Sequence, residues 1–161
     1  MAQDVLFGTL LGHNALILTL ISGCSSFSAS TPNTSRSRVV VSTSFGVPLD
    51  GQATLKLDWK DAKAQSLVLD TRDLKIAKVE AVDAAGKATA LKYALAPADK
   101  QLGSKLTIQA PQHPAQVRIA YTTAPTASGL QWLTPEQTAD KKLPFMFSQS
   151  ESIHARSWVP L

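Results

Sequence analysis

The chain has 161 residues, of which 44% are hydrophobic, which is enough to form one packed domain of ordinary size. Lys and Arg total 16 against 12 Asp and Glu, so the net charge is a modest +4, and aromatic residues make up only 6%. Without a dense run of cations or an array of aromatic residues, the composition argues against a nucleic-acid-binding protein.

An apolar stretch over residues 5–21 is predicted to be the core of a secretory signal. Its purest part is residues 15–21, and Gly8, Gly12, His13 and Asn14 interrupt its earlier half. The whole stretch is too short and too broken for a membrane-spanning helix, which needs roughly 20 apolar residues. The single cysteine, Cys24, excludes an internal disulfide and ends a tetrapeptide, Ile-Ser-Gly-Cys, that resembles the bacterial lipobox. Residues 1–24 are therefore the expected signal peptide and Cys24 the expected lipidation site. This assignment predicts export across the inner membrane to the periplasm or to a lipid-anchored position in the cell envelope.

An alternative stays open for this N-terminal segment. Residues 1–4 contain no Lys or Arg and include Asp4, whose charge is opposite to that expected at the start of a signal peptide. A wrongly assigned start codon would explain the difference. The other interpretation is a buried apolar segment with Cys24 in the core.

Residues 25–37 are mostly Ser, Thr, Asn and Pro and have no periodic apolar positions. This composition predicts a flexible tether between the anchor and the folded body.

The folded body is predicted to begin near Arg38 and to consist of β-strands. Apolar residues recur at every second position in several runs, and the residues between them are mostly polar. Such alternation gives an antiparallel sheet one face toward the core and one face toward water. The alternating residues are Leu55, Leu57, Trp59, Ile76, Val79, Leu91, Tyr93, Leu95, Leu106, Ile108, Val117, Ile119 and Tyr121.

Residues that favour turns separate these runs, at positions 48–51, 85–87, 103–104 and 111–114. Short strands at this spacing predict an all-β fold, either a sandwich or a curved antiparallel sheet. No sustained helical stripe occurs outside the signal candidate.

Three blocks of the sequence are distinctive. The first, residues 69–79, has a strand-turn-strand pattern. The second covers residues 130–138, and the third covers residues 144–156. These blocks resemble the zinc aminopeptidases of peptidase family M1, and within that family the branch containing the leukotriene A4 hydrolases. The resemblance spans roughly residues 48–161, and its last two blocks are the most specific.

This resemblance implies that residues 38–161 form the N-terminal β-saddle domain of such an enzyme. In the family, a loop with the pattern Gln-x-Glu or Gln-x-Gln enters the active-site cleft. Gln149 and Glu151 match its two side chains, and the backbone at Ser152 matches the border of the first substrate pocket. Glu151 is the aminopeptidase N variant of a position where leukotriene hydrolases have Gln, which favours the removal of N-terminal residues from peptides over epoxide hydrolysis.

The chemistry of a carboxylate at this position is direct. A free peptide α-amine is largely cationic near neutral pH, so a carboxylate in a partly desolvated cleft pairs with it. Such a charge-assisted hydrogen bond contributes roughly 1.5–3 kcal/mol. The implied substrates are peptides with a free N-terminus.

Other residues of these blocks are expected to have structural roles. Trp132, Phe145 and Phe147 are expected to lie in the core or at a domain interface. Arg156 is expected to pair with a carboxylate inside the domain.

The chain itself is not expected to bind the zinc ion of the family. Its histidines are His13, His113 and His154, no two of which have the i,i+4 spacing of a His-Glu-x-x-His helix. The Gly-x-Met-Glu-Asn loop and the catalytic tyrosine of the family are also absent. We therefore expect no catalytic residue and no metal ligand here, with zinc confined to the full-length parent enzyme. His113 and His154 are expected to be ordinary surface or core histidines.

The sequence stops at Leu161, inside a segment that the family continues. The expectation is a truncated N-terminal domain, inactive alone, whose partner is the missing zinc-bearing catalytic domain. The alternative is a stand-alone lipoprotein β-module that binds a peptide or a protein partner. An open reading frame encoding His-Glu-x-x-His downstream would favour the first function, and a genuine stop codon would favour the second.

Overall fold

The structure of the chain, a computed structural model, describes residues 15–16, 23–31, 34–43 and 48–161. The predicted signal peptide, residues 1–24, lies mostly outside the described residues. The described residues of the predicted tether, residues 25–37, lie in two paired strands that cover residues 23–31 and 34–43. Cys24 lies on the first of these strands, opposite Ser42. The boundaries of signal and tether stay predictions.

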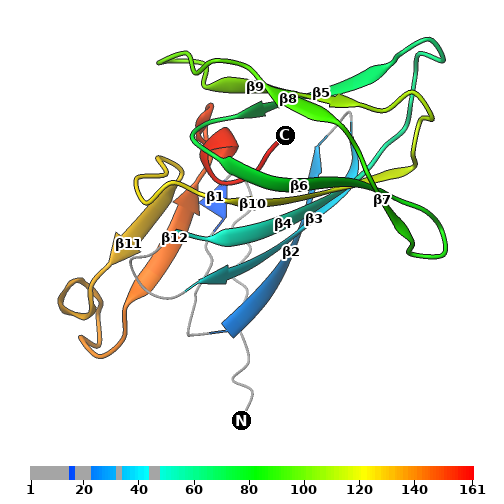
Figure 1. The fold of residues 1–161 in the computed structure, drawn as a ribbon. Coiled ribbons are helices and arrows are strands. Elements are labelled where there is room, and N and C mark those ends of the chain that lie inside the picture. Colours follow the sequence, from blue (N-terminus) through cyan, green and yellow to red (C-terminus); the bar gives the residue numbers. More distant parts are fainter. Residues whose placement is uncertain (1–14, 17–22, 32–33, 44–47) are drawn as a thin grey trace.

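The described residues form three antiparallel sheets (Figure 1). The largest has the order β2-β3-β4-β10-β6-β7, and two smaller sheets have the orders β5-β9-β8 and β1-β12-β11. The strands of the large sheet are β2 (Gly23–Thr31), β3 (Thr34–Thr43), β4 (Asp50–Lys56), β6 (Lys75–Val82), β7 (Ala88–Ala90) and β10 (Gln116–Thr122). Those of the small sheets are β5 (Ser66–Thr71), β8 (Tyr93–Leu95), β9 (Ser104–Gln109), β1 (Ala15–Leu16), β11 (Leu130–Leu133) and β12 (Phe145–Gln149). The prediction of an all-β, antiparallel fold is confirmed.

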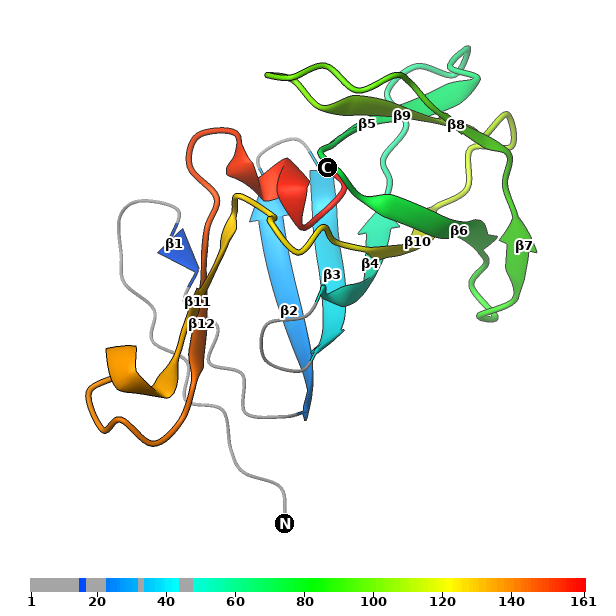
Figure 2. The same cartoon turned by 60° about the vertical axis from the view of Figure 1, so that its left-hand side comes forward.

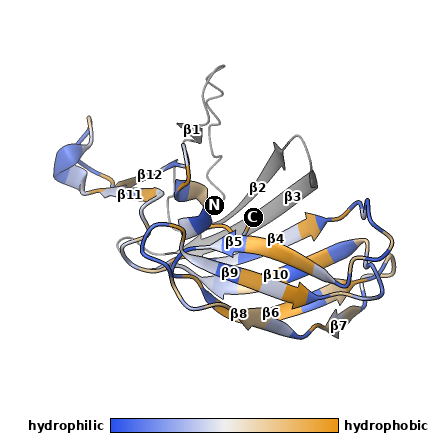
Figure 3. Ribbon diagram, turned by 90° about the horizontal axis from the view of Figure 1, so that it is seen from above, coloured by the Kyte–Doolittle hydropathy of each residue, from blue (hydrophilic) through white to orange (hydrophobic). Residues whose placement is uncertain are grey.

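The sheet β5-β9-β8 packs over one face of the large sheet, and the hairpin β11–β12 projects away from this pair of layers (Figures 1 and 3). Two short 3₁₀ helices complete the fold, η1 (Pro135–Gln137) between the strands of the hairpin and η2 (His154–Ser157) after β12. Figure 2 shows η2 and the C-terminal residues lying between the hairpin and β5. No helix among the described residues is long and apolar enough to cross a membrane.

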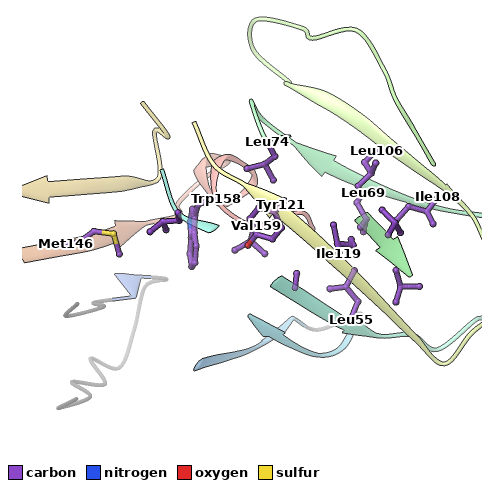
Figure 4. Close-up of a cluster of buried hydrophobic side chains, with 14 residues drawn as sticks. Leu55, Leu69, Leu74, Leu106, Ile108, Ile119, Tyr121, Met146, Trp158 and Val159 are labelled. Atoms are coloured by element: carbon purple, nitrogen blue, oxygen red, sulfur yellow. The ribbon is translucent and has the colours of Figure 1, made fainter. Parts of the chain in front are cut away.

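The core lies between the two packed layers and uses the alternation that the sequence contains (Figure 4). Val117 and Ile119 of β10 are fully buried and lie opposite Leu55 and Ala53 of β4. From the second layer, Leu106 and Ile108 of β9 are also fully buried. Burial of each Leu or Ile side chain contributes about 1.5–3 kcal/mol, so this interface accounts for much of the stability of the domain.

The structure departs from the predicted burial pattern at two places, the end of β4 and the edge strand β8. β4 stops at Lys56, and Trp59 instead stacks on His113 at a ring distance of 4.7 Å and donates a hydrogen bond to Pro114 O at 3.0 Å. Tyr93 and Leu95 lie on the edge strand β8 and stay 38% and 43% exposed. An edge strand lacks a neighbour on one side, so its apolar residues are only partly covered.

The predicted turns at residues 85–87 and 103–104 are confirmed, and each contains a glycine with a positive φ. Gly86 and Gly103 have φ values of 84° and 81°, in the turns that precede β7 and β9. The predicted turn at residues 48–51 is wrong at its end, because Gly51 lies inside β4. Residues 69–79 form the predicted strand-turn-strand unit, with the turn between β5 and β6.

Candidate functional site

The turn between β12 and η2 carries the three residues predicted to contact substrate. Gln149 is the last residue of β12, and its backbone N–H donates to Gly129 O at 2.9 Å. The Gln149 side chain accepts a hydrogen bond from Glu151 N–H at 3.1 Å through Oε1. Gln149, Glu151 and Ser152 are all exposed, and the peptide bond between Glu151 and Ser152 is cis. The Gln149 side chain therefore stabilises the turn by accepting a hydrogen bond from the Glu151 backbone.

A pocket of about 460 Å³ opens beside this turn. One wall consists of residues 125–131, and the other is formed by Gln149, Glu151 and His154. Ser152 is next to this second wall in sequence but does not line the pocket. The volume falls within the range of roughly 300–1,000 Å³ typical of small-molecule sites. The structure thus brings Gln149 and Glu151 together at one cavity and leaves Ser152 outside it.

The lining of the pocket contains one carboxylate, Glu151, and one imidazole, His154. Within the described part of the chain, no ion pair or hydrogen bond is made by the Glu151 carboxylate. The amide side chains of Gln131 and Gln149 lie on the same lining. An unpaired carboxylate beside neutral hydrogen-bonding groups favours a cationic ligand group, which gains a charge-assisted hydrogen bond there.

His154, which the sequence predicts to be an ordinary surface or core histidine, lines the pocket. Its Nδ1 lies 2.9 Å from Ser128 Oγ, on the other lining segment. Its backbone N–H donates to Ser150 O at 3.1 Å, which closes the turn around Glu151. The only hint in the sequence is that His154 follows Glu151 by three residues, a distance that a tight turn spans.

The hairpin β11–β12 sets the position of both walls. Trp132 pairs with Met146, which is fully buried, and Trp132 packs against the main core. The core role expected for Trp132 is thereby confirmed. Phe145 and Phe147 are half-buried on the other face of the hairpin, with ring centroids 6.4 Å apart.

The distinctive residues 134–138 form the end of this hairpin and do not line the pocket. Thr134 N–H donates to Gln137 Oε1 at 2.9 Å, and Thr138 Oγ1 donates to Pro135 O at 2.8 Å. A side-chain hydrogen bond from Thr134, together with a backbone one, holds the pKa of the Glu136 carboxyl below its usual range. Residues 134–138 therefore build a turn, and of the distinctive block 130–138 only Leu130 and Gln131 line the pocket.

Arg156 has the structural role that the sequence predicts. Its Nη1 lies 3.5 Å from the Asp70 carboxylate and donates to Leu102 O at 2.7 Å, while Nε donates to Ile153 O at 3.0 Å. The guanidinium thus joins η2 to β5 and to the turn before β9. The predicted pairing of Arg156 with a carboxylate is confirmed.

The residues present do not fit a zinc ion. Across the described residues, no three His, Cys, Asp or Glu side chains are grouped as a metal site. His113 stacks on Trp59, far from His154 in the chain, and His13 lies outside the described residues. We assign no chemistry of this chain to a bound metal.

Comparison with known proteins places this geometry in a family. The family model described as Peptidase M1 N-terminal domain matches residues 38–161. Leucine aminopeptidase 2 of Yarrowia lipolytica is 38% identical over 130 residues, which cover 70% of this chain and 19% of that protein. The leukotriene A-4 hydrolase homolog of Botryotinia fuckeliana is 35% identical over 116 residues, covering 68% of this chain and 17% of that protein.

The fold has solved counterparts as well. Native leukotriene A4 hydrolase from Saccharomyces cerevisiae matches with a TM-score of 0.61 and 30% identity, over 74% of this chain and 19% of that chain. The yeast enzyme in complex with bestatin matches with a TM-score of 0.59 and 31% identity, over 70% of this chain and 17% of that chain. The chain therefore spans about a fifth of the length of the relatives that it matches.

Proposed function

Because the chain belongs to the Peptidase M1 N-terminal domain family, we propose that it is the substrate-binding β-domain of a zinc aminopeptidase that removes N-terminal residues from peptides. Its own part in the reaction is recognition of the peptide α-ammonium group by Glu151, with Gln149 as the second contact and the backbone at Ser152 beside the first residue. The observation that carries this proposal is the Glu151 carboxylate on the lining of the 460 Å³ pocket.

The chemistry of the pocket favours cleavage after the first residue of a peptide. A carboxylate that pairs with the α-ammonium group binds a chain end and discriminates against an internal peptide bond, whose nitrogen carries no charge. The Gln149 side chain is held by the Glu151 backbone N–H, so its amide NH₂ group remains able to donate to a substrate carbonyl. Recognition of the charged end and of the first carbonyl together fixes the register of the peptide.

The hydrolytic step is assigned to a zinc-bearing catalytic domain of the family, because these 161 residues contain no His-Glu-x-x-His motif. Zinc supplies an activated water and polarises the scissile carbonyl in such enzymes. This chain supplies one wall of the cleft, and on its own it is expected to be inactive.

The proposal includes export and a lipid anchor at Cys24. It rests on the apolar residues 5–21 and on the lipobox-like tetrapeptide that ends at Cys24. Metabolic labelling with a radioactive fatty acid tests it. Label should enter the wild-type protein and not Cys24→Ser, whereas equal labelling of both proteins contradicts the assignment.

Kinetics of an enzyme that joins this domain to a catalytic domain of the family test the role of Glu151. With leucine 4-nitroanilide, Glu151→Gln should lower kcat/KM by about 10- to 100-fold, because a charge-assisted hydrogen bond of roughly 1.5–3 kcal/mol is lost. Glu136→Gln is the matched control, since Glu136 is another exposed carboxylate on the same hairpin and lies outside the pocket. Wild-type kinetics for Glu151→Gln would contradict the proposal.

A further inference from the structure

Both ends of the turn that carries Glu151 are tied to one residue, Gly129. The Gly129 carbonyl accepts a hydrogen bond from Gln149 N–H at 2.9 Å, just before Glu151. The Gly129 N–H donates to Ser157 Oγ at 2.8 Å, and the Ser157 hydroxyl donates onward to His154 O at 2.7 Å. Ser157 is 1% exposed, so its own two hydrogen bonds are shielded from water. The turn is thus closed around a single backbone position on the neighbouring lining segment, residues 125–131.

Packing around Gly129 leaves no room for a side chain. A β-carbon at this position would lie 2.6 Å from His154 O, 2.7 Å from Trp158 Cδ1 and 3.0 Å from Ser157 Oγ. All three distances are at or below the closest approach that real β-carbons show, so the absence of a side chain allows η2 to approach the wall. All three contacts come from residues that follow Glu151 and lie in or next to η2.

Trp158 holds the residue that immediately precedes Glu151. Its indole Nε1 donates to Ser150 Oγ at 3.2 Å, and the ring is 5% exposed. Ser150 O also accepts the His154 N–H at 3.1 Å. Ser150 is therefore fixed through its hydroxyl and its carbonyl, while Glu151 next to it stays exposed.

From these contacts we infer that Gly129, Ser157 and Trp158 form a clamp that holds the Gln149–Glu151 turn in one conformation, and that they are positioning residues for ligand recognition. The effect of the clamp on catalysis rests on the proposed function, whereas its effect on the conformation of the turn does not. A long carboxylate side chain on a free turn would lose conformational entropy on binding, so fixing the backbone beforehand strengthens the contact with the amine.

Amide hydrogen exchange of the full 161-residue chain, followed by NMR, tests the clamp directly. Trp158→Phe removes the indole donor and keeps an aromatic ring, and Ser150→Ala removes its acceptor. Each should accelerate exchange of the Gln149 and His154 amides about tenfold or more, with the Leu106 amide of β9 unchanged. Trp59→Phe is the matched control, because it removes another indole hydrogen bond, to Pro114 O, far from the turn in the chain. Exchange within twofold of wild type in Trp158→Phe and Ser150→Ala would overturn the clamp.

Kinetics of the joined enzyme separate the clamp from the proposed function. Trp158→Phe and Ser150→Ala should raise KM for leucine 4-nitroanilide about three- to tenfold with a smaller change in kcat, and Ser150→Thr, which keeps the hydroxyl, should restore most of the loss. Neither variant should add to the effect of Glu151→Gln. If exchange accelerates but Glu151→Gln has wild-type kinetics, the proposed function fails and the clamp stands. If Glu151→Gln is impaired while both clamp variants keep the wild-type KM, the positioning role is wrong.

Discussion

Tyr121 lies directly opposite Gly51 across the ladder of β4 and β10, and its ring covers the space that a β-carbon at residue 51 would occupy. A β-carbon built there would be 2.7 Å from the Tyr121 hydroxyl oxygen. Gly51→Ala should therefore lower the free energy of unfolding by about 1–3 kcal/mol, because an extra carbon in a packed core forces the ring to move. Urea denaturation measures the change. Gln52→Ala, an exposed neighbour on the same strand, should stay within about 0.5 kcal/mol of wild type, and equal losses for both variants would contradict this account.

The Tyr121 hydroxyl leads to a second prediction. The side chain is 2% exposed, and within the described residues the hydroxyl has no hydrogen-bond partner. Burial raises the pKa of this phenol, so it stays protonated throughout the physiological range. Tyr121→Phe removes a buried polar group without opening a cavity and should leave the free energy of unfolding unchanged or raise it by up to about 1 kcal/mol. A clear loss of stability, measured by thermal or urea unfolding, would reveal a bound partner for the hydroxyl.

Arg156 is predicted to act on stability through its carbonyl contacts more than through its ion pair. Its guanidinium donates to Leu102 O and Ile153 O, and the side chain is only 14% exposed, whereas Asp70 is 54% exposed. A lysine at this position cannot make both carbonyl hydrogen bonds, so Arg156→Lys should lower the free energy of unfolding, measured by urea denaturation, by about 1–2 kcal/mol. Asp70→Asn should cost less than about 1 kcal/mol, as expected for an exposed pair. A larger loss for Asp70→Asn than for Arg156→Lys would reverse the assignment.

Asp99 links the stability of the turn before β9 to pH. Its carboxylate accepts hydrogen bonds from the backbone N–H groups of Leu102 and Gln101 at 2.7 and 2.8 Å, which lower the pKa of Asp99 in the folded chain. A lowered folded pKa means that the stabilisation is present above the unfolded value, about 3.9, and is lost as pH falls through the folded value. Between about pH 5 and pH 2.5, the free energy of unfolding from urea denaturation should therefore fall more for wild type than for Asp99→Asn. Parallel pH profiles for the two proteins would rule out this contribution.

The periodicity of single strands was sufficient to predict the core, but not the ends of strands. Val117, Ile119 and Tyr121 alternate in the sequence and are buried as predicted, because their burial depends on the local pleat. Gly51 looks like a turn residue, yet it lies in β4, since its role depends on Tyr121, which is 70 residues away in sequence and meets it only across the sheet. Trp59 continues the alternation in sequence but stacks on His113 of another loop.

Half of the candidate site could be predicted, and the other half depends on long-range pairing. Gln149 and Glu151 belong to a contiguous motif, and the resemblance to the M1 family identified them. The other lining segment, residues 125–131, lies about 20 residues earlier, and only its last two residues, Leu130 and Gln131, belong to a recognised block. Residues 125–129 carry no motif of their own. The hairpin β11–β12 brings the two walls together through pairs such as Leu130 with Ser148. His154 joins the pocket because of a turn that local propensity does not specify.

The central claim is that the Glu151 carboxylate binds the α-ammonium group of a peptide. The most direct test is the distance between a Glu151 carboxylate oxygen and the amine nitrogen of a bound amino-acid analogue, in a crystal structure of an enzyme that contains this domain together with its catalytic domain. The account predicts a charge-assisted hydrogen bond of about 2.7–2.9 Å. A carboxylate that points into solvent while the amine is held by other groups would contradict it.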